Sequence, residues 1–333
     1  MMRSTIIATA ALLVAPGLQA AANAGNLTDA DILNFALTLE HLEAAFYSQG
    51  LAKYDAKAFS NAGFSDDVRK KIQTLSADET AHVDFLTTAL TAAGATPVQA
   101  CNYTFPHVDP KSFLAVSQIL EGVGVSAYLG AAGSIANANY LTAAATILTV
   151  EARHNAYIRH VNGESPFPAA FDTPVDPRSI VTLATPFFTG CPTGSAPAFQ
   201  GFPALNVTGK LIPGSKLIVA SANTTGATNC VFLSGLNTTS SSFANGTCDV
   251  PIDGKIGSGQ IYVLLTSSQN ASDASTIAGP AIVETEVPVS SNSSRNLATN
   301  ASGTAGTSGS SSVLTGGFAM LSAAAAGIVA LIV

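Results

Sequence analysis

Apolar residues recur at helical spacing through four long stretches in the first half of the chain. In the first stretch they stand at positions 32, 35, 39, 42 and 46. This spacing predicts an amphipathic helix that starts at Thr28 or Asp29 and runs to about Gly50. Similar patterns predict three more helices, over about 65–94, 112–135 and 138–161. Four helices of this length predict an all-α four-helix bundle within residues 25–165, with the loop 95–111 as its long crossover connection.

The second half of the chain changes its apolar period. Residues 166–203 are rich in proline and predict an irregular extension and linker. Beyond them, short runs of branched and aromatic residues predict strands at 216–220, 230–233, 260–266 and 281–287. We therefore expect a small all-β, sandwich-like domain over residues 204–289. It concentrates neither histidine nor acidic residues, so we interpret it as a spacer or adhesive module.

Both ends of the chain have the composition of processing signals. Residues 1–24 combine Arg3, a short apolar core and an Ala-x-Ala site, which predicts a secretory signal peptide. Residues 290–312 form a Ser/Gly/Thr-rich stalk, and residues 313–333 are small and apolar. This combination predicts a glycosylphosphatidylinositol (GPI) anchor signal. An ordinary C-terminal transmembrane helix is the alternative, although no Lys or Arg follows the tail.

Glycosylation sequons and the charge balance agree with a secreted, surface-anchored protein of the cell wall. The chain has 14 Lys and Arg against 21 Asp and Glu, without a basic cluster, which argues against nucleic acid as a partner. Nine Asn-x-Ser/Thr sequons predict glycan acceptors: Asn26, Asn102, Asn206, Asn223, Asn237, Asn245, Asn270, Asn292 and Asn300.

The four cysteines are disulfide candidates in an oxidising compartment. Four cysteines allow three connectivities. We favour Cys101 with Cys191, which would staple the helical domain, and Cys230 with Cys248 inside the β-domain. The alternative of a cysteine metal site fails because the C-x-x-C spacing is missing.

A four-part motif occurs twice in order along the predicted helices. Each copy has a Glu, a Tyr seven residues later, and then a Glu-x-x-His: Glu40, Tyr47, Glu79 and His82 in the first, and Glu121, Tyr128, Glu151 and His154 in the second. Residues three or seven apart share one helix face. Four helices facing inward would therefore gather four carboxylates and two imidazoles, the ligand set of a dinuclear iron or manganese site.

Two copies of this motif would rarely arise by chance, because the whole chain has only eight Glu and five His. Glu121 is the only charged residue between Lys111 and Glu151, so we expect it to be buried and to need a partner or a metal. The alternative is a structural Glu held by hydrogen bonds.

Other titratable residues near the motif have weaker patterns. Glu43 lies one helical turn from Glu40 and aligns with Gly124 in the second copy, so it could be an extra ligand or an acid behind the ligands. Tyr47 and Tyr128 suit hydrogen bonds to the ligands. His41 should point away from the site, and we interpret His107 and His160 as ordinary surface residues.

The same residues carry a family resemblance. The stretch 31–47, the motif Asp78-Glu-Thr-Ala-His82 and the motif Glu151-Ala-Arg-His154 resemble the ferritin-like, desiccation-related family, whose fungal members include stress-responsive and late-sexual-development proteins. The resemblance covers about residues 26–192. It implies a ferritin-like bundle with a non-haem di-metal centre, and it implies no settled activity.

Together, these patterns predict a ferritin-like four-helix bundle followed by a sandwich-like β-domain, with two iron or two manganese ions as cofactors. Such a site could react with peroxide, as in the manganese catalases that resemble this fold, or with dioxygen, as a ferroxidase does. The alternative is a non-catalytic wall, desiccation or adhesion protein with a structural or vestigial metal site. The metal, the substrate, the oligomeric state and enzymatic activity itself stay open.

Overall fold

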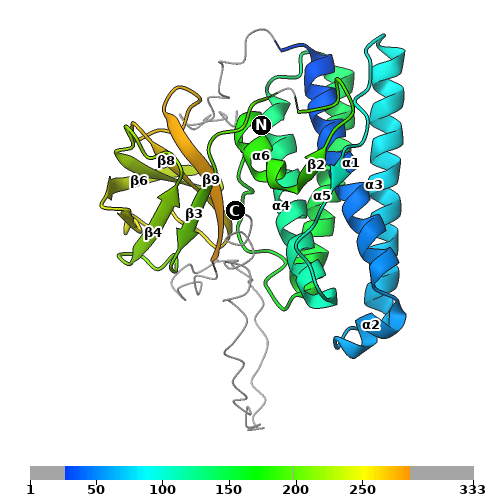
Figure 1. The fold of residues 1–333 in the computed structure, drawn as a ribbon, viewed down its shortest axis with the longest axis horizontal. Helices are drawn as coiled ribbons and strands as arrows, with labels where there is room; N and C mark the ends of the chain where they lie inside the picture. Colours follow the sequence, from blue (N-terminus) through cyan, green and yellow to red (C-terminus); the bar gives the residue numbers. More distant parts are fainter. Residues whose placement is uncertain (1–26, 198, 286–333) are drawn as a thin grey trace, which may run out of the picture.

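A computed structural model describes residues 27–197 and 199–285 of the chain. The predicted signal peptide, stalk and anchor signal lie outside the described residues, as do the sequons at Asn26, Asn292 and Asn300. Within the described part, a helical bundle is followed by an antiparallel β-domain (Figure 1). The predicted order of an all-α domain and then a small all-β domain is confirmed.

Four long helices lie side by side and form the bundle (Figure 1). They are α1 (Asp29–Lys53), α3 (Asp66–Ala92), α4 (Pro110–Ala132) and α5 (Ala138–Val161). Their apolar faces enclose a core that includes Phe46, Ile72, Phe113 and Ile158, each with 0% of its surface exposed. Burial of these faces, rather than helix propensity alone, stabilises the bundle.

Local sequence explains where each long helix starts. Thr28, Ser65, Asp109 and Asn137 are the four N-cap residues, and the side chain of each accepts a hydrogen bond from a backbone N–H of the first turn. Such caps satisfy amide groups that have no partner within the helix. Asp109 is followed by Pro110 at the first helical position, where a missing N–H costs nothing.

Short elements that the sequence pattern does not predict flank the bundle. The six-residue helix α2 (Ala56–Asn61) lies between α1 and α3. The segment 166–203 contains α6 (Pro177–Ala184), the 3-10 helix η1 (Thr185–Phe187) and β2 (Phe188–Gly190). Strand β2 pairs with β1 (Asn102–Tyr103) of the crossover loop. The Cys101–Cys191 disulfide closes this pair and ties the extension to the loop, as the sequence predicts.

The β-domain is one continuous antiparallel sheet of seven strands in the order β3-β4-β7-β6-β5-β8-β9. The strands are β3 (Leu205–Thr208), β4 (Lys216–Ser221), β5 (Asn229–Ser234), β6 (Asn237–Ala244), β7 (Thr247–Asp249), β8 (Gly259–Thr266) and β9 (Thr276–Thr285). The sheet curls until its two edges approach, and the Gly279 N–H donates to the Pro203 carbonyl beside β3. It is therefore nearly a barrel rather than two separate sheets.

Apolar side chains from the inner face of the sheet fill this curled domain. Among the core residues are Leu217, Phe232 and Leu265, each with 0% of its surface exposed. The predicted disulfide between Cys230 of β5 and Cys248 of β7 lies in the same core. The domain thus has a hydrophobic core of its own.

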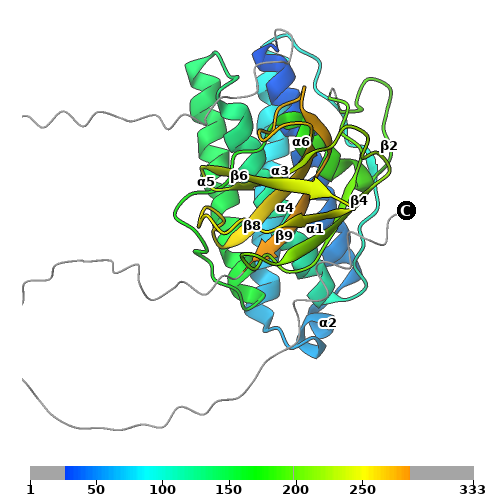
Figure 2. The ribbon, with the colours of Figure 1, turned by 90° about the vertical axis from the view of Figure 1, so that its left-hand side faces the viewer.

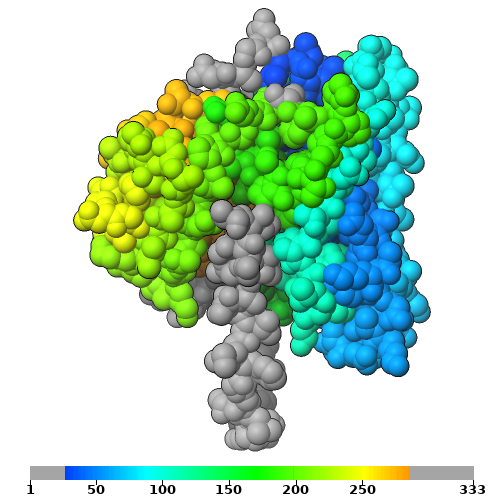
Figure 3. Space-filling view, in the orientation of Figure 1, coloured from blue at the N-terminus to red at the C-terminus, as the bar shows by residue number. Residues whose placement is uncertain are grey.

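The β-domain packs directly against the bundle (Figures 2 and 3). The buried Tyr262 of β8 donates its hydroxyl proton toward Ser126 Oγ of α4, at 2.7 Å. Arg159 of α5 is 2% exposed and forms ion pairs with Glu164 and with Glu284 of β9. These contacts fix the sheet on one side of the bundle, next to α4 and α6.

Helix α4 is long and apolar enough to cross a membrane by length and composition alone. Most of its most apolar stretch is buried inside the folded chain. Its position between the other helices and the β-domain therefore accounts for its high hydropathy.

Candidate metal centre

The structure gathers the six residues of the repeated motif at the centre of the bundle. Each of the four long helices contributes at least one of them. They are Glu40 on α1, Glu79 and His82 on α3, Glu121 on α4, and Glu151 and His154 on α5. The four carboxylates are completely buried, and the two imidazoles are at most 8% exposed.

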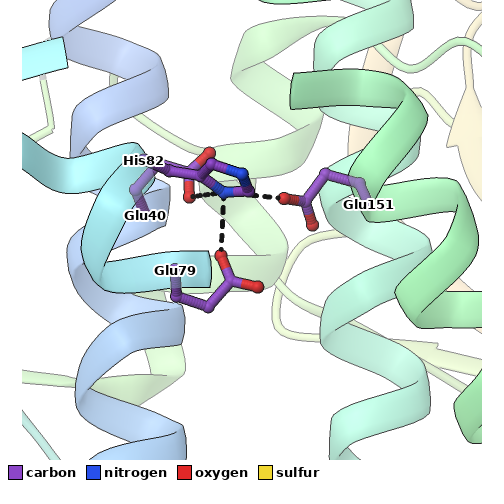
Figure 4. Close-up of side chains that lie close together, drawn as sticks. All are labelled: Glu40, Glu79, His82 and Glu151. Atoms are coloured by element: carbon purple, nitrogen blue, oxygen red, sulfur yellow. Dashed lines mark hydrogen bonds and ion pairs between the residues drawn. The ribbon is translucent and has the colours of Figure 1, made fainter. Parts of the chain in front are cut away.

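His82 is the centre of the first group of side chains (Figure 4). Its Nδ1 atom lies 3.1 Å from an oxygen of Glu40 and 3.2 Å from oxygens of both Glu79 and Glu151. The carboxylates point toward this nitrogen from three different helices. One ligand atom from each of these four residues could hold a metal ion.

His154 is the centre of the second group. Its Nδ1 atom lies 2.9 Å from Glu79 Oε1 and 3.4 Å from Glu121 Oε2. Glu79, Glu121, Glu151 and His154 form a second set that could hold a metal ion. Because Glu79 and Glu151 belong to both sets, they lie where two bridging carboxylates of a dinuclear centre would be.

Asp78 is a functional candidate that the sequence reasoning missed. Its carboxylate lies 3.2 Å from Nε2 of His154, on the side of the ring opposite to Nδ1. A carboxylate that accepts the second ring N–H fixes the tautomer and the orientation of a ligating imidazole. Asp78 stands 76 residues before His154, so spacing along the chain gave no signal for the pair.

The two tyrosines pair crosswise between the two halves of the repeat. Tyr47, from the first copy, donates its hydroxyl to Glu121 of the second copy and also contacts Ser117. Tyr128, from the second copy, donates to Glu40 Oε1 of the first copy at 2.5 Å. The carboxylates of Glu40 and Glu121 are therefore each oriented by a phenol from the opposite half.

Glu43 and Gly124 occupy equivalent positions in the two copies of the motif. Glu43 is buried, with 4% of its surface exposed, but it belongs to neither metal set. A Cβ atom at Gly124 would lie only 3.1 Å from Glu43 Oε1 and 3.2 Å from Glu151 Oε2. The missing side chain at Gly124 thus leaves the space that the Glu43 carboxyl group occupies beside Glu151.

The carboxylic acids of the cluster have raised pKa values. Burial, and then repulsion from Glu151, raises the pKa of Glu79 to about 7. Burial raises the pKa of Glu151 to about 8, against the opposing effect of the His82 imidazole, whose Nδ1 atom lies 3.2 Å away. Burial also raises the pKa of Glu121 and that of Glu43, the latter strongly. Without a cation, these groups would share protons rather than all be ionised.

The two imidazoles have raised pKa values because carboxylates surround them. Burial alone would lower the pKa of His82, but the carboxylates of Glu151, Glu40 and Glu79 around its Nδ1 atom raise it to about 12. Burial opposes the rise at His154 as well, where the nearby carboxylates of Glu121 and Glu79 raise the pKa to about 11. Both rings therefore lie where a positive charge is strongly favoured.

The donor set fits a pair of divalent cations. Five buried atoms of the cluster lack a hydrogen bond of good geometry: Glu79 Oε1, Glu121 Oε2, both carboxylate oxygens of Glu151, and His154 Nδ1. Buried polar atoms are normally paired, and buried charges are paired or bind metals. Positive ions between the two groups would satisfy these atoms and reduce the repulsion between the carboxylates.

The remaining histidines lie outside the cluster. His41 turns away from it, and its Nε2 atom lies 3.1 Å from the Val98 carbonyl. His160 is exposed, as predicted. The prediction for His107 is wrong, because only 6% of its surface is exposed. Its Nδ1 atom lies 2.9 Å from the Tyr54 hydroxyl, within a cluster of aromatic rings that includes Phe46.

The four long helices that surround this site lie in a part of the chain that is similar to ferritin-like domains. Residues 28–164 match the ferritin-like domain family. This stretch covers α1 to α5 and all six residues of the repeated motif.

Two particular proteins are also similar to the chain. The chain is 30% identical over 183 residues to the protein rds1 of Schizosaccharomyces pombe, a match that covers 54% of this chain. It spans less than half of that relative, 44% of its length. A crystal structure of a conserved hypothetical protein, rv2844, from Mycobacterium tuberculosis is also similar. It has 23% identity and a TM-score of 0.35, over 43% of this chain and 96% of the other.

Proposed function

We propose that the protein holds a dinuclear iron or manganese centre in its bundle and that this centre reacts with dioxygen or peroxide. The observation that supports the proposal is the pair of four-residue groups that share Glu79 and Glu151. Two ions bridged by carboxylates and each bound by one imidazole are the arrangement of dinuclear sites in ferritin-like bundles.

The chemistry of the donors favours iron or manganese over a structural zinc ion. The two sets offer carboxylate oxygens and one imidazole nitrogen each. Structural zinc sites are instead tetrahedral and rich in Cys and His. When bound, such a pair of ions supplies two redox-active centres next to each other.

The protein's own residues have distinct roles in this proposal. Glu40 and Glu121 are terminal ligands, held by the hydroxyl groups of Tyr128 and Tyr47. Asp78 orients the His154 ring through Nε2. Phenols and an aspartate behind the ligands can also hold protons at defined oxygen atoms close to the centre.

We also propose that the protein is secreted and tethered to the cell surface by a GPI anchor. The two disulfides support an oxidising location. Five predicted glycan acceptors within the described residues are exposed: Asn102, Asn223, Asn237, Asn245 and Asn270. Glycans at these positions would not disturb the core. The anchored protein would then face oxidants outside the cell.

Metal content measured by mass spectrometry on the purified secreted protein tests the proposal. We expect about two iron or manganese ions per chain, as in related dinuclear bundles, and less than half of this in Glu121→Gln, which keeps the side-chain volume. Asp84→Ala, on the exposed side of α3, is the matched control and should keep both ions. If the wild-type protein takes up neither metal, the proposal is wrong and the alternative of a non-catalytic wall or adhesion protein remains.

A further inference from the structure

A cavity of about 120 Å³ lies between the bundle and the β-domain, apart from the metal-ligand atoms. Its walls come from α1, α4 and α6 on one side and from β3 and β9 on the other. Two regions far apart in the sequence, and the connection between them, therefore line one space. Ligand sites are common at such domain interfaces.

The walls of the cavity are mostly apolar. Leu39, Val123, Leu183 and Ile282 are among the lining residues. Thr182 also lines it, but its hydroxyl donates to the Arg178 carbonyl and accepts from the Phe202 N–H. Such a surface favours a ligand that leaves water readily, and it offers little to a small polar molecule such as peroxide.

The inner end of the cavity reaches the candidate metal centre. Glu43 and Gly124 both line it. A Cβ atom at Gly124 would lie 3.2 Å from Glu151 Oε2. The inner end of the cavity is therefore close to Glu151, which belongs to both metal sets. The buried Glu43 carboxyl group is the polar feature at this end, and it can form a hydrogen bond with a hydroxyl or amino group.

The volume sets the size of the ligand. An apolar cavity of about 150 Å³ in another protein stays dry and binds benzene. A cavity of about 120 Å³ therefore accepts a molecule of roughly six or seven non-hydrogen atoms. Dioxygen needs much less room than this.

We propose that this cavity binds a small apolar organic molecule with one hydroxyl or amino group, about the size of phenol, whose polar group is held by Glu43. Its body lies between α4, α6 and β9, and its polar end faces the carboxylates of the bundle. That this molecule is a substrate rests on the proposed function, whereas its binding does not. The β-domain thus forms one wall of a ligand site next to the metal centre.

Calorimetric titration of the metal-free full chain with phenol and with benzene tests the proposal. Asn206 lines the cavity and is a predicted glycan acceptor, so the chain is produced in a host that adds no N-glycans. We expect saturable binding of both probes, with phenol about fivefold tighter because of one hydrogen bond. Glu43→Leu should abolish this preference and leave benzene binding within about twofold of the wild-type value.

Two filling variants and one control show whether the probes bind in this cavity. Ala184→Leu and Ala281→Leu add bulk at two different walls and should each weaken both probes by about tenfold or more, because close-packed interiors do not absorb extra methylene groups. Ala145→Leu, at an exposed position of α5, should bind both probes as the wild type does. Thermal melts exclude variants that fail to fold.

The outcomes separate the cavity from the metal centre. A folded wild-type protein that binds neither probe, or filling variants that bind as well as the wild type, would overturn the cavity proposal. Metal content is measured on the same samples. Phenol binding by a protein that never takes up metal would support the cavity and refute the proposed function alone.

Discussion

Gly124 shows how one missing side chain shapes the site. The first copy of the motif has Glu43 at this position, and the second has glycine. The space left by the absent Cβ lets the Glu43 carboxyl group lie beside Glu151 and also opens the inner end of the cavity. The two halves of the centre are thus unequal, and the acidic extra residue is on the side that faces the β-domain.

The hydrogen bonds from Tyr47 to Glu121 and from Tyr128 to Glu40 lead to a prediction about a single hydroxyl group. Tyr128→Phe removes the proton that the phenol donates to Glu40 and leaves the shape of the core unchanged. Loss of such a contact behind a metal ligand typically weakens metal binding by about 10- to 100-fold. We expect Tyr128→Phe to lose metal to a competing chelator at concentrations about tenfold lower than the wild type requires.

Tyr140→Phe is the matched control for this experiment. Tyr140 lies on α5, eleven residues or about three helical turns before Glu151. Its variant should release metal as the wild type does. Equal metal retention by the Tyr128 and Tyr140 variants would show that the phenol does not support the ligand.

The sequence was sufficient to predict that the residues of the repeated motif lie together. Residues three or seven positions apart share one helix face, so each helix pattern already indicated which side chains point the same way. It could not identify Asp78 as the partner of His154, since the two residues lie on different helices. His107 was misjudged for the same reason. Its hydroxyl partner, Tyr54, stands 53 residues away, so neither residue alone indicated that the ring would be buried.

Helix α4 connects the two domains at the scale of whole elements. It contributes Glu121 to the candidate metal centre, Gly124 to the cavity and Ser126 to the contact with Tyr262. A helix with partners on several sides must be apolar almost all round. This explains why α4 passes a test for membrane helices although it is a core element.

The contact between α4 and β8 predicts a stability effect. Tyr262→Phe leaves the buried Ser126 hydroxyl without the phenol and removes the contact with the Gly122 carbonyl, 3.3 Å away. We expect a loss of about 1–2 kcal/mol in the free energy of unfolding, the typical cost of one buried hydrogen bond. Chemical denaturation of the metal-free protein measures this loss.

A double-mutant cycle with Ser126→Ala separates the hydrogen bond from packing. If the two hydroxyl groups bond each other, the second substitution costs much less once the first has been made. Simple additivity of the two losses would show that Tyr262 and Ser126 act independently.

The long helices were predictable and the short elements were not. Strong periodicity and good N-caps give the four long helices, with ends close to those expected. Helix α6 has a cap at Asp176 followed by Pro177, but the surrounding prolines suggested an irregular chain. Strand β6 consists mainly of Asn, Thr and Ser, so no alternation of apolar residues indicated it, and its register depends on its neighbours in the sheet.

At the scale of the whole molecule, the sequence could not show that the two domains share a site. The interpretation of the β-domain as a mere spacer is incomplete, because β9 lines the cavity and its Glu284 pairs with the buried Arg159 of α5. Arg159 and Glu284, for example, are 125 positions apart. Composition and local periodicity carry no information about such pairs.

Proton binding by the metal-free cluster predicts how the stability of the whole protein changes with pH. The pKa values of Glu79 and Glu151 rise from 4.5 to about 7 and about 8 in the folded chain. The folded protein therefore binds more protons than the unfolded chain between about pH 4.5 and 8, and its stability falls as pH rises through this window. The raised pKa values of His82 and His154 also make stability fall as pH rises, and they extend this decline above pH 8.

Metal ions should reverse this trend, because they replace the protons and bind ligands that must be deprotonated. We expect chelator-treated protein to melt at a lower temperature at pH 8 than at pH 5 in scanning calorimetry. The difference between metal-loaded and metal-free protein should widen over the same range. Glu151→Gln, which cannot ionise, should flatten the slope of the metal-free protein. A metal-free wild type that gains stability from pH 5 to pH 8 would mean that the carboxylates are held ionised by something other than metal.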